Sequence, residues 1–366
     1  MRATANAEYD RIISYDVGSL PFDGDSEKLL QGARKYGAQD TGSTRYFRDV
    51  VIKGLLDKKS AGIDLPNFPQ FRDMNEMFLE SITGLKKIDG GYIVTDRFEL
   101  TNATIPEVEV IKRNSDPLAK EIGGPFDLKL CVTGPYTLSS FLPHRDAEIL
   151  AMFGEIITKI VDRNIFDTRK SRVRLVVVDE PFFGTVDDPL LDRGSEGREV
   201  LLKAWDSSFR KANSRGAETG IHIHCTTDEL FWKARWLNVI ETEAEDPLLV
   251  KGGTRKMLER EDKFLRASIC ITNFDRLIEK KVGSKPERIA DAWTLIKRGT
   301  IDPEAFLEDV QTMERRLLRT IDLFGQERVP YAGPECGMRG FPSYKCAIQC
   351  LARVSKAVRS VNRGSA

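Results

Sequence analysis

The chain has 366 residues, 41% of them hydrophobic, and its 56 basic and 56 acidic side chains cancel to a formal net charge of zero. This length and apolar content suffice for a large buried core. Zero net charge gives no electrostatic argument for a nucleic-acid partner, and no apolar run approaches the roughly 18–20 residues that would span a membrane.

Short β-branched runs alternate with longer amphipathic segments along the chain, which is typical of βα units and a parallel sheet. Eight such runs are visible, at 12–17, 62–65, 128–132, 175–179, 220–224, 238–243, 267–271 and 329–332. Helical patterns between and after them include 147–167, 198–212, 285–298, 303–324 and 342–361. Eight strands with intervening helices predict an α/β fold, the TIM (β/α)8 barrel.

The chain shows no linker, repeat or low-complexity tract, so we expect one domain over residues 1–366. An insertion of about 68–125 separates the second and third runs, and its segments 90–94 and 108–111 are interpreted as a hairpin. The six cysteines are scattered and no secretory signal precedes them. This pattern predicts free or metal-bound thiols in a cytoplasmic protein.

A barrel of this type carries its active residues at the C-terminal ends of the strands. The fifth run ends in His222-Ile223-His224-Cys225, and the eighth is followed by Gly333-Pro334-Glu335-Cys336-Gly337. The chain has only three histidines, so a pair of them beside a cysteine is a specific signal. Together with a distant cysteine held between glycines, it predicts a zinc site assembled from separate parts of the barrel.

The motifs at the strand ends resemble the catalytic barrel of the cobalamin-independent methionine synthases, in its short, barrel-only form. The resemblance spans nearly the whole chain and rests on six motifs in order: Val17-Gly18-Ser19-Leu20-Pro21, Thr133-Gly134-Pro135-Tyr136-Thr137, Val178-Asp179-Glu180-Pro181, the histidine strand, Val239-Ile240-Glu241-Thr242-Glu243 and Gly333-Pro334-Glu335-Cys336-Gly337. It implies a zinc-dependent methyltransferase that methylates the thiol of homocysteine to give methionine.

The resemblance also implies the zinc ligands. The family uses His and Cys of an H-x-C strand end, a Glu on the next strand and the Cys of a G-P-x-C-G loop. Cys336 matches the last of these, and Glu243 matches the Glu, with Glu241 on the same strand face as its competitor.

The H-x-C element is altered, because the order in this chain is His222-Ile223-His224-Cys225. Strand alternation places His222 and His224 on one face and turns Cys225 away. A bulge or chain turn after His224 would instead deliver His224 and Cys225 together. Both arrangements stay open at this point, and both give a mixed zinc site.

For the substrate, the resemblance assigns the homocysteine carboxylate to Ser19 and the ammonium to Asp179. A family Glu that also grips the amino group is replaced near its position by Gln70. The loss of one carboxylate leaves room for another thiol. On a purely structural interpretation, Asp179-Glu180-Pro181 ends a strand and caps the next segment.

We expect the methyl donor to be a methyl-corrinoid or a methyl-tetrahydropterin. Folate-using members stack the pterin on an aromatic residue after the G-P-x-T element and protonate it with a His after the seventh strand. In this chain the stacking aromatic residue, a Trp in those members, is missing, and Asn273 lies near the position of that His. A methyl-corrinoid needs no such acid, so these losses favour a corrinoid, with a corrinoid protein as partner; His144 is the candidate replacement acid.

Three alternatives remain. The first is a methyl-corrinoid methyltransferase for another thiol. The second is a uroporphyrinogen-decarboxylase-like enzyme, which would hold no stoichiometric zinc and would need arginines around a tetrapyrrole. The third is a non-catalytic zinc- or thiol-binding subunit of a methyl-transfer complex.

Overall fold

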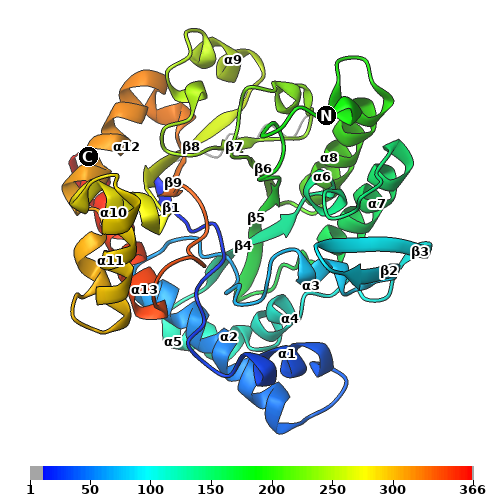
Figure 1. Ribbon diagram of the computed structural model, residues 1–366, viewed down its shortest axis with the longest axis horizontal. Helices are drawn as coiled ribbons and strands as arrows, with labels where there is room; N and C mark the ends of the chain where they lie inside the picture. Colours follow the sequence, from blue (N-terminus) through cyan, green and yellow to red (C-terminus); the bar gives the residue numbers. More distant parts are fainter. Residues whose placement is uncertain (1–10, 365–366) are drawn as a thin grey trace.

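The computed structural model describes residues 11–364 as a ring of strands enclosed by helices (Figure 1). Residues 1–10 and 365–366 of the expected single domain lie outside the described residues. The strands are β1 (Ile13–Ser14), β2 (Ile82–Ile88), β3 (Gly91–Leu100), β4 (Phe126–Thr133), β5 (Ser171–Asp179), β6 (Glu218–His222), β7 (Val239–Glu241), β8 (Phe264–Cys270) and β9 (Tyr331–Pro334). Seven of them form a parallel sheet in the order β1-β9-β8-β7-β6-β5-β4.

The second predicted run closes the gap between β1 and β4. Leu65 N donates to Ser14 O at 2.9 Å on one side, and Lys129 N donates to Pro66 O at 2.9 Å on the other. This segment forms isolated parallel bridges rather than a regular strand. Because proline has no N–H to donate, Pro66 limits the ladder here. All eight predicted runs thus lie in the wall, and the α/β TIM-barrel prediction is confirmed.

Helices cover the outside of the ring (Figure 1). They are α1 (Ser26–Lys35), α2 (Gly42–Ser60), α3 (Glu76–Leu79), α4 (Pro106–Arg113), α5 (Ser115–Ile122), α6 (Pro135–Ser139), α7 (Ala147–Asn164), α8 (Glu196–Ser214), α9 (Thr254–Arg260), α10 (Phe274–Val282), α11 (Pro286–Lys297), α12 (Val310–Phe324) and α13 (Tyr344–Gly364). Many begin at a side-chain cap; the Asp146 carboxylate, for example, accepts from Ile149 N at 2.8 Å to start α7. None of these described helices is long and apolar enough to cross a bilayer.

The predicted helix at 303–324 is in fact two elements. A short 3-10 turn covers Pro303–Phe306, and α12 begins only at Val310. Asp309 separates them because its side chain accepts from Thr312 N at 2.7 Å and caps α12.

The insertion between the second wall segment and β4 holds α3, the antiparallel β2–β3 hairpin, α4 and α5. The predicted segment 90–94 does enter the second strand of this hairpin, but the prediction of a strand at 108–111 is wrong, since it lies in α4. Pro106 occupies the first turn of α4, where its missing N–H costs nothing. Val108 and Ile111, three residues apart, are buried on one helix face. The single-domain organisation stays a prediction.

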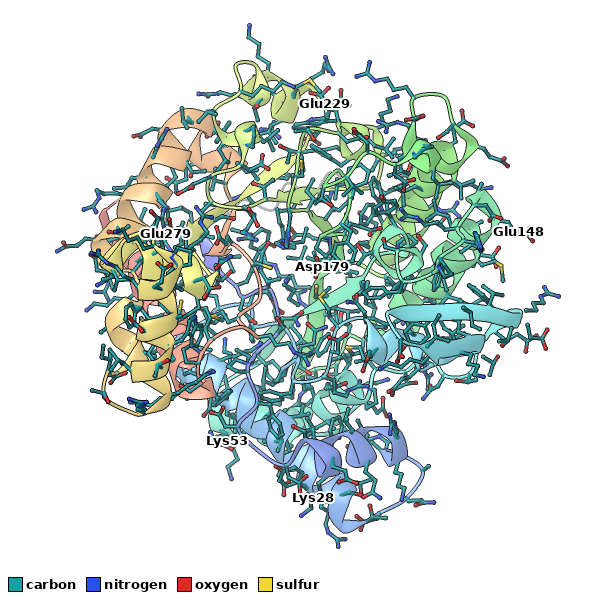
Figure 2. The ribbon with its side chains drawn as sticks, viewed as in Figure 1. Lys28, Lys53, Glu148, Asp179, Glu229 and Glu279 are labelled. Atoms are coloured by element: carbon teal, nitrogen blue, oxygen red, sulfur yellow. The ribbon has the colours of Figure 1, made fainter. Side chains whose placement is uncertain are left out.

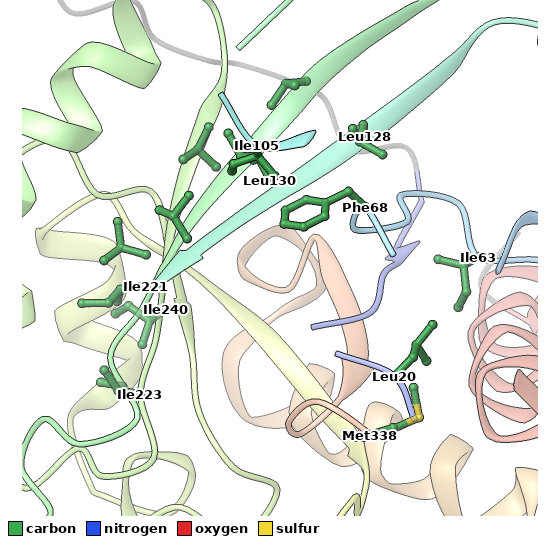
Figure 3. Close-up of a cluster of buried hydrophobic side chains, with 14 of the residues drawn as sticks. Leu20, Ile63, Phe68, Ile105, Leu128, Leu130, Ile221, Ile223, Ile240 and Met338 are labelled. Atoms are coloured by element: carbon green, nitrogen blue, oxygen red, sulfur yellow. The ribbon is translucent and has the colours of Figure 1, made fainter. Parts of the chain in front are cut away.

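Side chains alternate between two cores along the wall strands. Outward residues such as Ile221, Ile223 and Ile240 pack in the large core beneath the helices, where they lie together (Figure 3). Inward residues such as Val177 and Val239 form a smaller cluster. This alternation decides which polar side chains face the barrel interior.

Candidate metal centre

Four neighbouring strands place charged or titratable side chains in one layer. Strand register pairs Asp179 with His222, His222 with Glu241, and Glu241 with Arg266. Three of them are fully buried and Asp179 is 6% exposed; Asp179 lies near the centre of the ring (Figure 2). Parallel register and alternation therefore gather residues separated by 87 positions at the C-terminal end of the strands, from Asp179 to Arg266.

His222 belongs to this layer and forms, with His224 and Cys336, a group whose ligand atoms all lie within 4.8 Å of one another. His224 Nε2 is 3.3 Å from Cys336 Sγ, and the two imidazole rings are perpendicular with centroids 5.3 Å apart. Cys225 lies outside this group, and its Sγ is 3.0 Å from Thr227 Oγ1. The geometry therefore corresponds to the H-x-H alternative.

The group suits a cation. His222 Nε2 is buried and has no hydrogen-bond partner among residues 11–364. Burial alone would lower the pKa of His222, but Asp179, Cys336 and Glu241 together raise it to about 10, so the surroundings favour positive charge. Burial and His222 lower the pKa of His224 to about 3, which leaves the neutral imidazole that a metal ligand requires. Two imidazoles and a thiolate are a donor set that zinc prefers.

The two candidate carboxylates differ in position. Glu243 lies beyond the end of β7, partly exposed, with Oε1 3.9 Å from His224 Nδ1. Glu241 is fully buried, with Oε2 3.5 Å from His222 Nδ1. Neither belongs to the three-residue group. Glu243 thus remains the candidate fourth ligand, whereas Glu241 supports His222 from the far side of its ring.

Ser19 lies against the loop that carries Cys336. A Cβ atom on Gly337 would fall 2.0 Å from Ser19 Oγ, so a larger residue there would displace the Ser19 hydroxyl, and Met338 N donates to Ser19 O at 2.9 Å. Gln70 pairs with Ser19 through a parallel bridge. Its backbone O accepts from Leu20 N at 3.0 Å, and its side-chain Nε2 donates to Met77 Sδ at 3.6 Å.

Asp179 offers an unsatisfied oxygen to the site. Its Oδ1 is buried without a hydrogen-bond partner in the described part of the chain, and its Oδ2 is 4.0 Å from Cys131 Sγ. Burial raises the pKa of Asp179, while His222 and Lys129 oppose that rise. The predicted acid His144 is exposed on the loop between α6 and α7.

Two further residues near the metal centre were not predicted from the sequence. Arg266 is fully buried inside β8, and a charged residue within the apolar run of that strand is the signal that could have revealed it. Glu335 precedes Cys336, and its carboxylate accepts from Thr272 N at 3.0 Å and from Ala244 N at 3.2 Å. It thereby ties the cysteine loop to the loops that follow β7 and β8.

Glu180 caps a helix, but this helix is α6, which follows β4, and not the segment that comes next in the chain. Its carboxylate accepts from Tyr136 N at 3.1 Å and Thr137 N at 2.7 Å, at the start of α6. Trp205 Nε1 donates to it as well, at 2.9 Å. Glu180 therefore positions the segment after β4 rather than facing the group of histidines.

This carboxyl group gives a testable pH dependence. Burial raises the pKa of Glu180 from an ordinary 4.5 to about 7, although Trp205 and Thr137 act to lower it. The folded state then binds this proton more tightly than the unfolded state, so the group's contribution to stability falls as pH rises between these values. We expect the stability of the wild type relative to Glu180→Gln to decrease between pH 5 and pH 8, measured by urea unfolding. A pH-independent difference would show that the three donors keep the carboxylate ionised throughout.

No family model matches the chain, but individual proteins do. It is 26% identical over 320 residues to a methionine synthase of Sulfolobus acidocaldarius, covering 85% of this chain and 80% of the relative. A methionine synthase of Sulfurisphaera tokodaii is 24% identical over 322 residues, with coverage of 86% and 82%. Over most of its length the chain is therefore similar to methionine synthases.

The fold agrees with this family. A B12-independent methionine synthase from Shewanella sp. W3-18-1, solved in complex with selenomethionine, superimposes with a TM-score of 0.63. The match covers 97% of this chain and 99% of that one at 15% sequence identity, so it bears on the fold alone. The expected resemblance is thereby confirmed.

Proposed function

We propose that the protein is a zinc-dependent methyltransferase that transfers a methyl group to the thiol of homocysteine and so forms methionine. The observation that carries this proposal is the group of His222, His224 and Cys336 at the C-terminal end of the barrel, in a chain related to methionine synthases. These three residues would hold the zinc ion, with Glu243 as candidate fourth ligand. Bound zinc would keep a substrate thiol as thiolate, of which a free thiol with a pKa of about 8.5 supplies little at neutral pH.

The chain's own residues would orient the amino acid. Asp179 presents a buried oxygen without a partner among the described residues, which suits the ammonium of homocysteine. Ser19 lies beside Gly337 in the cysteine loop, where its hydroxyl and nearby N–H groups can hold the carboxylate. Gln70 adds no second carboxylate, so recognition of the ammonium rests on Asp179.

A methyl-corrinoid is the donor that the site favours. A methylated pterin must be protonated to leave, whereas a corrinoid need not be. Asn273, near the position where folate-using enzymes carry a histidine, instead caps α10 by accepting from Arg276 N at 3.2 Å. His144 faces solvent and remains the candidate acid for the pterin alternative.

The proposal is tested by loss of methyl from defined donors. Metal-analysed protein is given methylcobalamin or a methyl-tetrahydropterin, with homocysteine or coenzyme M, and the methylated thiol is quantified by mass spectrometry. We expect stoichiometric zinc and methionine formed from methylcobalamin and homocysteine. Turnover only with coenzyme M would support the other-thiol alternative, zinc without turnover would support the binding subunit, and protein without zinc or thiol-dependent demethylation would overturn the proposal.

A further inference from the structure

We propose that Arg266 is a positioning residue that fixes the two separate halves of the metal site relative to each other. This inference rests on the proposed metal-dependent function. One half is the end of β6, which carries His222 and His224, and the other is the loop after β9, which carries Cys336. Arg266 lies fully buried between them.

On the histidine side, Arg266 acts through Glu241. Its Nη2 is 3.4 Å from Glu241 Oε2, and the same oxygen is 3.5 Å from His222 Nδ1. A carboxylate at Nδ1 favours the tautomer with the proton on that nitrogen, which leaves the Nε2 lone pair free for a metal. Nε2 is the atom without a hydrogen-bond partner among the described residues. Arg266 Nη2 also lies 3.5 Å from Nδ1. The guanidinium therefore contacts both the imidazole ring and the carboxylate.

On the cysteine side, the same guanidinium holds the backbone. Its Nη1 donates to Pro334 O, and its Nη2 donates to Glu335 O at 3.3 Å. These are the carbonyls of the two residues that precede Cys336. Nη1 also donates to Ser268 Oγ at 2.9 Å, and this bond fixes the guanidinium to β8, the strand that carries both residues.

The requirement is specific for arginine. A planar fork with several donors in fixed directions can contact a carboxylate and two carbonyls at once, whereas a lysine ammonium is a single point on a flexible stem. Lysine at this position would retain the charge that compensates Glu241 but would lose part of the two-sided contact. This difference separates positioning from simple charge compensation.

The test measures cobalt(II) binding to the full chain. Cobalt(II) reports its ligands through its visible absorption and through the thiolate-to-cobalt charge-transfer band of Cys336. We expect Arg266→Met to weaken cobalt binding by about 10- to 100-fold, the range typical for residues that orient metal ligands, and to weaken the charge-transfer band per bound ion. Arg266→Lys should fall between this variant and the wild type.

Arg72→Met is the matched control. Arg72 is also buried and makes a bidentate ion pair with Glu107 at 2.7 Å, but in the insertion. Its removal should leave cobalt affinity and spectrum unchanged, and unfolding midpoints of all variants separate loss of fold from loss of metal. If Arg266→Met does not fold, the cobalt affinity and spectrum of Arg266→Lys test the positioning role.

The outcomes distinguish this inference from the function beneath it. Wild-type affinity and spectrum in the folded Arg266 variants would overturn the positioning role while leaving the metal site intact. Failure of the wild type to bind cobalt through Cys336 would instead overturn the proposed function.

Discussion

Replacing Cys336 with serine is expected to abolish metal retention and thiol methylation together. Cys336 Sγ lies 3.3 Å from His224 Nε2 and is the one sulfur in the three-residue group. Without metal activation only a few per cent of a free thiol is ionised at pH 7, so the rate should fall by at least about 30-fold. Zinc content by elemental analysis and methionine formation by mass spectrometry measure the two effects.

Cys225→Ser is the matched control, because Cys225 is a second partly buried thiol, directly follows His224 in the chain and has its Sγ beside Thr227. This variant should keep its zinc and its rate. If Cys225→Ser also lost the metal, the site would be built on the alternative in which the chain turns after His224 and delivers Cys225 as well.

The barrel was predictable because each wall strand is a short apolar run with its own boundary. Only one strand of the hairpin could be predicted, because the apolar residues of 108–111 are compatible both with a strand and with the buried face of a helix. The buried positions three residues apart, Val108 and Ile111, together with Pro106 in the first turn decide for the helix.

The site could be predicted to the level of residue types at strand ends. Alternation alone placed His222 and His224 on one face, but it could not place Cys225, which follows the end of β6 where no ladder constrains direction. The contacts of Arg266 and Glu335 depend on which loops meet across the barrel. No local sequence pattern contains that information.

A buried ion pair lies next to the segments that carry Ser19 and Gln70, and we expect it to contribute strongly to the free energy of unfolding. Lys58 Nζ lies 2.5 Å from Asp16 Oδ2, with both side chains fully buried. The ammonium also donates to Asn67 O at 3.1 Å, and Asp16 Oδ1 accepts from Asn67 N at 2.9 Å. The pair therefore joins α2, the end of β1 and the segment that leads to Gln70.

Lys58→Met is expected to lower the free energy of unfolding by about 3–5 kcal/mol, because it leaves the Asp16 carboxylate buried without a compensating charge. Urea unfolding followed by circular dichroism measures this change. The burial that makes the effect large also lowers the pKa of Lys58, and the Asp16 carboxylate opposes this decrease.

Two further variants isolate the cause. Lys53→Met removes a lysine from the same helix that pairs with Asp57 but is 69% exposed, so its cost should stay below about 0.5 kcal/mol. Lys58→Met/Asp16→Asn removes both charges and keeps an acceptor for Asn67 N, and it should recover much of the lost stability. A double variant as unstable as Lys58→Met would mean that the ammonium's hydrogen bonds to Gly18 O and Asn67 O, rather than compensation of the carboxylate, support the loops that carry Ser19 and Gln70.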